Sequence, residues 1–244
     1  MIADVHGNAP ALDAVLAEVD RESPDLVVLA GDAAGGPWQG AVLDRLMALD
    51  RARFVRGNVD RVMVQAFDEG WTFDPEEPTP WRKAGGWIAE RMTKEHRDFL
   101  ASFEETVAVD DVLVCHGSPR SDDETMTSLT PEADLRELLA GVDRSIVVCG
   151  HTHVQYDRTV DQTRIVNTGS VGMPFQAPTA AYWLMLGPEP ELRRTDYDVE
   201  RTAAEIRASD YWDAENAANQ LLNPPDPHEM EELYERARIR RSSS

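Results

Sequence analysis

Residues Val147–Asp157 read VVCGHTHVQYD, and this stretch raises the question that organises the rest of the chain. A run of strand-forming residues ends at Gly150 and is followed at once by His151 and His153. In an extended chain, side chains two residues apart lie on the same face, about 7 Å apart along the strand. Both imidazoles are therefore predicted to face one point. Taken alone, the pair is equally well explained as a solvated turn, so the rest of the chain must decide.

The same order of strand, polar motif and helix recurs in the first half of the chain. Residues 25–32, DLVVLAGD, form a continuous apolar run typical of a strand covered on both faces, and residues 53–60, RFVRGNVD, form a second short strand. Apolar residues at helical spacing predict helices from 9 to 19 and from 39 to 49. Strands that alternate with helices favour parallel pairing.

Strands in the second half follow one another without intervening helices, which favours antiparallel pairing. We place them at Gln155–Val160, Arg164–Asn167, Ala180–Leu186 and Glu191–Tyr197. The sum is an α/β architecture with mixed sheets. From residue 199 the pattern becomes helical and polar. We therefore predict a domain of residues 1–198 and a helical appendage, residues 199–244, that packs on the domain or extends from it.

Composition predicts a globular protein and limits its partners. The chain has 244 residues, 42% of them hydrophobic, which is ample for a packed core. Its 45 acidic and 24 basic residues give a formal charge of -21, which repels DNA, RNA and anionic membrane surfaces. No apolar segment approaches the length of a membrane span. We expect neither a nucleic-acid polymer nor a membrane as partner.

The chain contains two cysteines, Cys115 and Cys149, each in an apolar run beside a histidine motif. They are predicted to be small buried hydrophobes rather than a disulfide. This cysteine usage favours a reducing compartment, and we therefore expect a cytoplasmic protein.

Five polar clusters stand at the C-terminal ends of predicted strands, which is where open α/β sheets bind ligands. Four of the six histidines lie in these clusters. The candidate donors are Asp4, His6, Asp32, Asn58, His116, His151 and His153. Such a mixed nitrogen and oxygen set suits Mn²⁺, Fe, Ni²⁺, Co²⁺ or Zn²⁺. Seven donors are too many for one tetrahedral site, but they suit two metals that share a bridging carboxylate.

The ordered motifs D-x-H, GD, GN-x-D, H-G and GH-x-H resemble those of the calcineurin-like metallophosphoesterase superfamily. VNTGSVGMP, residues 166–174, resembles the closing motif of its small bacterial phosphodiesterase-type members. The match spans residues 4 to about 185. The resemblance implies a four-layer αββα sandwich of two mixed β-sheets flanked by helices. It also implies a binuclear phosphohydrolase, with Mn²⁺ the foremost metal, that cleaves a small phosphate ester or nucleotide by metal-bound hydroxide.

The resemblance also implies a role for each donor. Asp4, His6 and His153 would hold one metal, Asp32 would bridge, and Asn58, His116 and His151 would hold the second. Alternatives are a non-catalytic sensor of metal and nucleotide, and a phosphomonoesterase or protein phosphatase of the same superfamily. The sequence predicts no particular oligomeric state.

The chain departs from the family pattern at Val59, where many members carry a histidine that protonates the leaving oxygen or binds the phosphate. Asp60 and His6 are the candidates for that proton, besides water, and Asn58 completes the predicted catalytic group. General acid assistance is worth about 10²–10⁴-fold. We therefore expect a preference for good leaving groups or a lower rate.

A second departure is the short apolar stub Met1–Ala3, which stands where family members carry a full strand. We expect a few upstream residues to belong to the protein, because neighbouring strands would otherwise lose ladder partners.

Three polar residues near the motifs are candidates for substrate binding. Arg61 either grips the substrate or pairs with Asp60. Arg120, which follows Ser118, either meets a phosphate with its planar fork or forms a salt bridge to Asp122 or Asp123.

Other residues are predicted to have structural roles. Asn8 is expected to cap a helix, and Asn167 to order a turn beneath the metal loops. Trp71, Trp81 and Trp87 are expected to pack a lid helix on the core rather than to stack a base.

Overall fold

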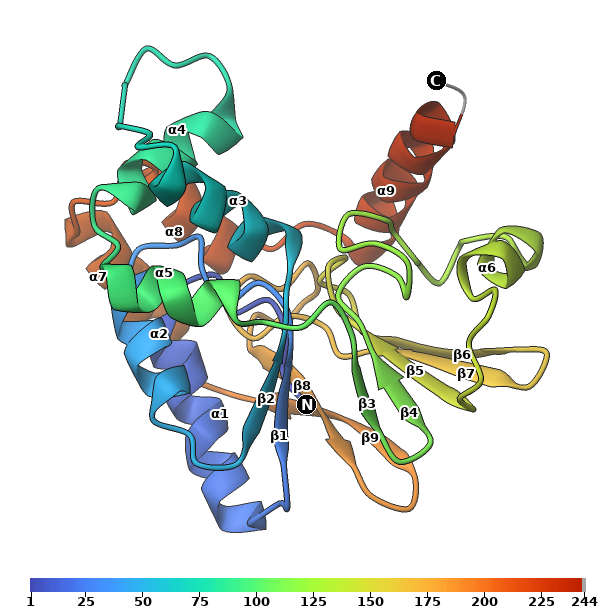
Figure 1. Ribbon diagram of the computed structural model, residues 1–244. Helices are drawn as coiled ribbons and strands as arrows, with labels where there is room; N and C mark the ends of the chain where they lie inside the picture. Colours follow the sequence, from blue (N-terminus) through green and yellow to red (C-terminus); the bar gives the residue numbers. More distant parts are fainter. Residues whose placement is uncertain (243–244) are drawn as a thin grey trace.

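The computed structural model describes residues 1–242 and contains two β-sheets that face each other between layers of helices (Figure 1). The first sheet contains β1 (Val27–Ala30) and β2 (Ala52–Val55), which are parallel, and the antiparallel pair β8 (Ala181–Leu186) and β9 (Pro190–Thr195). Residues 1–3 lie between these two pairs. They therefore join the four strands into one mixed sheet.

The stub occupies this central position through backbone hydrogen bonds on both sides. The amide of Ile2 donates to Val28 at 2.9 Å, and the Leu184 amide donates to Met1 at 2.9 Å. Residues 1–3 thus provide the ladder partners that the neighbouring strands β1 and β8 need. Whether residues upstream of Met1 belong to the protein stays a prediction.

The second sheet has the order β3-β4-β5-β7-β6. Its strands are β3 (Val107–Val109), β4 (Val112–Val114), β5 (Ile146–Cys149), β6 (Tyr156–Val160) and β7 (Thr163–Asn167). The three central strands are parallel, whereas β3 and β6 pair antiparallel at the two edges. The structure therefore combines parallel pairs of strands from the first part of the chain with antiparallel pairs from its second half, as predicted.

Helices cover both outer faces. They are α1 (Ala9–Glu22), α2 (Gln39–Met47), α3 (Asn58–Asp68), α4 (Pro80–Ala89), α5 (Lys94–Ala101), α6 (Glu132–Leu138), α7 (Val199–Ala208), α8 (Ala214–Leu222) and α9 (Pro227–Ser242). The side chain of Asn8 caps α1 by accepting a hydrogen bond from the Ala11 amide at 3.2 Å. The predicted cap is confirmed. Within residues 1–242, no helix is both long and apolar enough to cross a bilayer.

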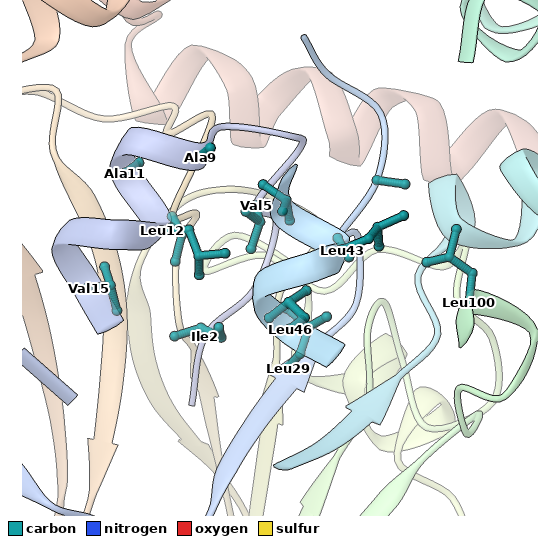
Figure 2. Close-up of a cluster of buried hydrophobic side chains, with 14 of the residues drawn as sticks. Ile2, Val5, Ala9, Ala11, Leu12, Val15, Leu29, Leu43, Leu46 and Leu100 are labelled. Carbon is teal, nitrogen blue, oxygen red and sulfur yellow. The ribbon is translucent and has the colours of Figure 1, made fainter. Parts of the chain in front are cut away.

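Three apolar clusters separate the four layers. Leu29 points from β1 toward α1 and α2, where it joins Leu12 and Leu46 (Figure 2). Its neighbours Val28 and Ala30 point the other way and fill the space between the two sheets. Both faces of β1 are thus buried, which explains its uninterrupted apolar sequence and confirms the predicted αββα sandwich.

The outer face of the second sheet packs against α6. Val147 and Cys149 of β5 join Cys115 and Leu135 in this third cluster. Both cysteines are buried and free, as the sequence predicts.

The helices after residue 198 pack on the rest of the chain. α7 and α8 contact each other through a small cluster that includes Ile206 and Leu221. Tyr211, in the connection between them, meets the buried Trp87 of α4 edge-on at 5.0 Å between ring centroids. Trp71 and Trp81 pack against each other at 5.4 Å. Trp87 therefore has the predicted role in the core, whereas Trp81 is 52% exposed and contacts Trp71 at the surface, so the prediction is wrong for that pair.

Candidate metal centre

The polar motifs gather where strands of both sheets end. Asp4 follows the stub, Asp32 follows β1, and Asn58 follows β2 as the first residue of α3. His116 follows β4, and His151 lies two residues beyond β5. Because these strand ends adjoin across the two facing sheets, residues up to 149 positions apart come into contact.

The first group of donors contains Asp4, His6 and His153, whose ligand atoms lie within 4.8 Å of one another. His153 Nε2 is 3.2 Å from Asp4 Oδ1 and 3.1 Å from His6 Nε2. His153 Nδ1 donates to the Met173 carbonyl at 2.7 Å, which leaves the Nε2 lone pair directed at the group. Asp4 Oδ1 is buried without a hydrogen-bond partner. A buried, unpaired carboxylate oxygen beside imidazole lone pairs fits a divalent cation.

The second group contains Asp4, Asp32 and His116. His116 Nδ1 donates to the Ala30 carbonyl at 2.8 Å, so that its Nε2 faces Asn58 Oδ1 at 3.1 Å and Asp32 Oδ2 at 3.4 Å. The same Asp32 oxygen lies 3.6 Å from His6 Nε2 in the first group. Asp32 therefore stands between the two groups, where a bridging ligand would stand.

His151 lies beside the second group rather than within it. Its ring meets that of His116 edge-on, with centroids 4.9 Å apart, and its amide donates to Asp4 Oδ2 at 2.9 Å. The structure thus brings together all seven predicted donors, although the His151 ring lies farther from the two groups than the other donors do. Their roles as metal ligands stay a prediction.

The expectation that His151 and His153 face one point is wrong. Both residues have left-handed backbone angles, with φ of 68° and 59°, so the segment is not extended and side chains do not alternate. One ring therefore turns toward His116 and the other toward His6 and Asp4.

Backbone strain is concentrated at these donors. Eight non-glycine residues among those described have positive φ. Two of them, Asp110 and Asp161, lie at turns, and Ser23 caps the C-terminus of α1. The other five are Asp4, His6, Asp32, His151 and His153. Such conformations cost about 1–3 kcal/mol each and persist where the surrounding structure enforces them, most often at functional sites.

Burial and neighbouring charges shift the pKa values of the donors in different directions. Burial lowers the pKa of His6 to about 4 and that of His151 to about 3, so both rings are neutral. Burial alone would raise the pKa of Asp32, but His116 outweighs it and lowers that pKa below its ordinary value. Burial would likewise lower the pKa of His116, yet Asp32 and Asp4 raise it to about 10. A cation beside Asp32 would displace the His116 proton.

Asp60 supports the backbone segments that carry Asp32 and Asn58. Its carboxylate accepts hydrogen bonds from the amides of Asp32 at 2.8 Å, Gly57 at 3.0 Å and Ala34 at 3.1 Å, and the residue is fully buried. Burial and the nearby Asp32 raise the pKa of Asp60 to about 7, although the amides of Gly57 and Ala34 oppose this. This geometry favours an anchoring role. The proton-donor role assigned to Asp60 stays a prediction.

Asn167 ties the two loops of the centre together, as the sequence predicts. Its amide group donates to the Gly150 carbonyl at 2.7 Å and to Thr152 Oγ1 at 3.0 Å, and its oxygen accepts from the Gly169 amide at 2.9 Å. These bonds hold the segment that carries His151 and His153.

The predicted substrate-binding residues are engaged in ion pairs at the rim. Arg61 pairs with Asp122 at 2.8 Å, and Arg120 pairs with Glu124 at 2.7 Å. Ser118 Oγ donates to the same Glu124 at 2.5 Å. Two alternatives inferred from sequence are therefore wrong: Asp60 binds backbone amides rather than Arg61, and Asp122 pairs with Arg61 rather than with Arg120. A pair of Arg120 with Asp123 stays a prediction.

Those alternatives failed because neighbours in sequence are not neighbours in space. Asp60 points inward to backbone amides, and the chain turn at 118–121 carries Arg120 toward α6. Contact of Arg61, Ser118 and Arg120 with substrate stays a prediction.

Sequence reasoning missed Tyr234, which lies on α9 near the centre. Its hydroxyl donates to the His151 carbonyl at 3.4 Å, and the two rings lie 6.1 Å apart. No motif marks it, because 83 residues separate it from His151 and its helix has no clear apolar stripe.

Gly57→Ala is expected to disrupt the centre. A Cβ atom there would lie 1.9 Å from Asp32 Oδ1 and 2.4 Å from the Asp32 amide nitrogen. Overpacking of this kind costs about 1–3 kcal/mol, and relief requires Asp32 to move. We expect a lower free energy of unfolding and less Mn²⁺ bound per chain, measured by denaturant unfolding and elemental analysis.

Gly187→Ala is the matched control, because nothing lies within 4 Å of the added Cβ. Equal metal content in the two variants would contradict the placement of Asp32 in the centre.

Three solved structures have similar folds. A metallophosphoesterase from Sphaerobacter thermophilus shares 24% identity at a TM-score of 0.70, over 90% of this chain and 96% of that one. The hypothetical protein PH1004 from Pyrococcus horikoshii OT3 shares 17% sequence identity at a TM-score of 0.77, over 92% of this chain and 97% of that one. A cold-active protein-tyrosine phosphatase of a Shewanella species shares 15% sequence identity at a TM-score of 0.50, over 78% of each chain. No curated protein matches the sequence.

The structure is an αββα sandwich whose Asp and His donors cluster at strand ends and could hold metal ions. Residues 1–186 match the family model described as the calcineurin-like phosphoesterase superfamily domain. The chain therefore belongs to the calcineurin-like phosphoesterase superfamily, and the resemblance seen in its motifs is confirmed.

Proposed function

We propose that the protein is a binuclear phosphohydrolase that cleaves a small phosphodiester or nucleotide-type ester. One observation carries this proposal: Asp32 Oδ2 lies 3.6 Å from His6 Nε2 and 3.4 Å from His116 Nε2. One carboxylate thus faces a histidine of each donor group, and the two groups also share Asp4, which suits a pair of cations bound side by side. Mn²⁺ is the proposed metal, and Fe, Ni²⁺, Co²⁺ or Zn²⁺ suit the same donors.

The residues of the chain have distinct tasks in this mechanism. Asp4, His6 and His153 would hold one cation, and Asn58, His116 and His151 the other, with Asp32 between them. When bound, divalent cations lower the pKa of water and stabilise negative charge on the phosphoryl oxygens. The His116 and His153 rings are held in orientation by the Ala30 and Met173 carbonyls, so little reorganisation is needed.

Neither Val59 nor His6 is suited to give a proton to the leaving group. Val59 packs against the loop at Gly35, and its amide donates to Asp32 Oδ1 at 2.9 Å. Burial lowers the pKa of His6 to about 4, so its ring is neutral near pH 7 and is not an imidazolium acid. We therefore propose that the leaving oxygen takes its proton from water and that good leaving groups react best.

Metal analysis coupled to an ester panel tests the function. The protein, loaded with Mn²⁺, is assayed on p-nitrophenyl phosphate, bis(p-nitrophenyl) phosphate, nucleotides and dinucleoside polyphosphates. We expect two ions per chain and hydrolysis of at least one ester. Two bound ions without turnover of any ester would instead support the sensor alternative. The cytoplasmic location stays a prediction from cysteine usage.

Val59→His is expected to supply the missing general acid. Val59 N–H contacts Asp32, so a side chain at this position starts beside the proposed bridge. We expect kcat for an alkyl ester to rise by about tenfold or more, and kcat for a p-nitrophenyl ester to change little, because only a poor leaving group needs the proton. Equal effects on both esters would contradict this explanation. Val62→His, one turn further along α3, is the matched control.

A further inference from the structure

A cavity of about 770 Å³ lies beside the proposed metal centre, on the side of His151. His151 and Tyr234 form part of its lining, so the cavity is continuous with the edge of the donor cluster. Its other walls come from α6, from residues 120–125 and from α9. A volume of this size falls within the range of about 300–1,000 Å³ that small-molecule sites occupy.

The wall that α9 contributes lies outside residues 1–186, the part of the chain that matches the superfamily. It is nevertheless fixed in place. Glu231 accepts hydrogen bonds from the Ser128 amide at 2.7 Å and from Ser128 Oγ at 2.8 Å. Glu235 accepts from Thr127 Oγ1 at 2.8 Å and from Thr130 Oγ1 at 2.5 Å.

These four bonds end on carboxylates and are therefore of the stronger, charge-assisted kind. Arg238 extends the attachment by pairing with Asp134 of α6 at 2.8 Å across the cavity wall. The α9 helix is therefore a built wall of the cavity.

The charge of the lining limits what the cavity accepts. Four carboxylates line it, from Asp123, Glu124, Asp134 and Glu137, against two guanidinium groups, from Arg120 and Arg238. Both guanidinium groups already pair with lining carboxylates, Arg120 with Glu124 and Glu137, and Arg238 with Asp134. Four negative and two positive charges leave an excess of two negative charges. A second phosphate in this space would be repelled, whereas a neutral or cationic group would be accepted.

We propose that this cavity binds the organic group of the substrate and selects esters whose alcohol is neutral or positively charged. The inference rests on the proposed function, since the donor cluster would hold the single phosphoryl group. Water adds to phosphorus, the P–O bond to one alcohol breaks, and that alcohol leaves with a proton of the water. Substrates of this class are phosphate esters of amino alcohols or polyols, and polyphosphates are excluded.

The test reverses one charge of the lining. Glu137→Lys is compared with Glu132→Lys, a control of equal charge change on the same helix α6 but outside the lining. Binding of choline to the full-length protein is measured by calorimetry, with and without added Mn²⁺. We expect wild type and Glu132→Lys to bind choline alike, and Glu137→Lys to bind it about tenfold more weakly, because two charge units change within the cavity.

A kinetic comparison accompanies the binding measurement. For the Mn²⁺-loaded wild type, kcat/KM for p-nitrophenyl phosphorylcholine is expected to exceed kcat/KM for diadenosine tetraphosphate. In Glu137→Lys, the ratio of these two kcat/KM values is expected to be smaller. Equal choline binding by the two lysine variants, or a wild-type preference for the polyphosphate, would overturn the inference. If no ester is hydrolysed, the proposed function is contradicted instead. The choline-binding measurement would then still test whether the cavity accepts a cationic group.

Discussion

Asp32→Asn is expected to lower the Mn²⁺ content by at least one ion per chain and to reduce hydrolysis by at least about 100-fold. Loss of a residue that only supports a metal ligand typically costs 10–100-fold in affinity or activity, and a bridging ligand should cost more. Asparagine keeps the shape of the side chain and the acceptor for the Val59 amide, but it removes the charge that faces His6 and His116. Elemental analysis and steady-state kinetics on the same preparation measure both effects.

Asp157→Asn is the matched control for this experiment. Asp157 lies on β6, outside both groups of donors, and pairs with Arg164 at 2.8 Å at the surface. Its replacement should leave metal content and rate unchanged, because an exposed pair is worth only about 0–1 kcal/mol. Full activity and full metal content in Asp32→Asn would contradict the bridging role.

Asp60→Ala is expected to lower the free energy of unfolding by about 3 kcal/mol or more. The three amides of Asp32, Ala34 and Gly57 would lose their acceptor in a buried place, and each unsatisfied group costs about 1–3 kcal/mol. Because the loop of Asp32 loses its anchor, metal content should fall as well. Denaturant unfolding followed by tryptophan fluorescence, together with elemental analysis, measures both.

The two roles open to Asp60 predict different outcomes. An anchor predicts loss of stability and of metal in Asp60→Ala, with partial recovery in Asp60→Asn, which keeps one acceptor oxygen. A proton donor predicts normal stability and metal content in Asp60→Asn but a reduced rate that falls most for poor leaving groups. The second pattern would show that the carboxylate leaves its backbone partners during turnover.

The sequence predicts the fold well because its strands are buried on both faces. The run DLVVLAGD is uninterrupted because Leu29 packs toward the helices while Val28 packs toward the second sheet. Each donor motif follows such a run directly, so the end of a strand determines where Asp32 or His116 lies. Convergence of the motifs follows from the topology of parallel strands.

The directions of individual side chains were less predictable. An extended backbone was assumed at His151 and His153, but tertiary contacts hold both residues at positive φ. Asp4 takes part in this, since its Oδ2 accepts the His151 amide across 147 residues. Local sequence carries no signal for a contact of that separation.

The partners of surface charges and of α9 were unpredictable for the same reason. Arg61 has Asp60 beside it in sequence, yet it reaches Asp122. Glu231 and Glu235 look like ordinary surface residues of a polar helix, and only the position of Thr127 and Ser128 gives them a role. The cavity beside His151 therefore becomes visible only in three dimensions.

The existence of a cation pair at Asp32 is tested most directly by anomalous diffraction from crystals of the Mn²⁺-loaded protein. We predict two anomalous peaks about 3.5–4 Å apart. One should lie among Asp4, His6 and His153, the other beside His116, with Asp32 in contact with both. A single peak that leaves Asp32 uncoordinated, or no peak at these residues, would contradict the account.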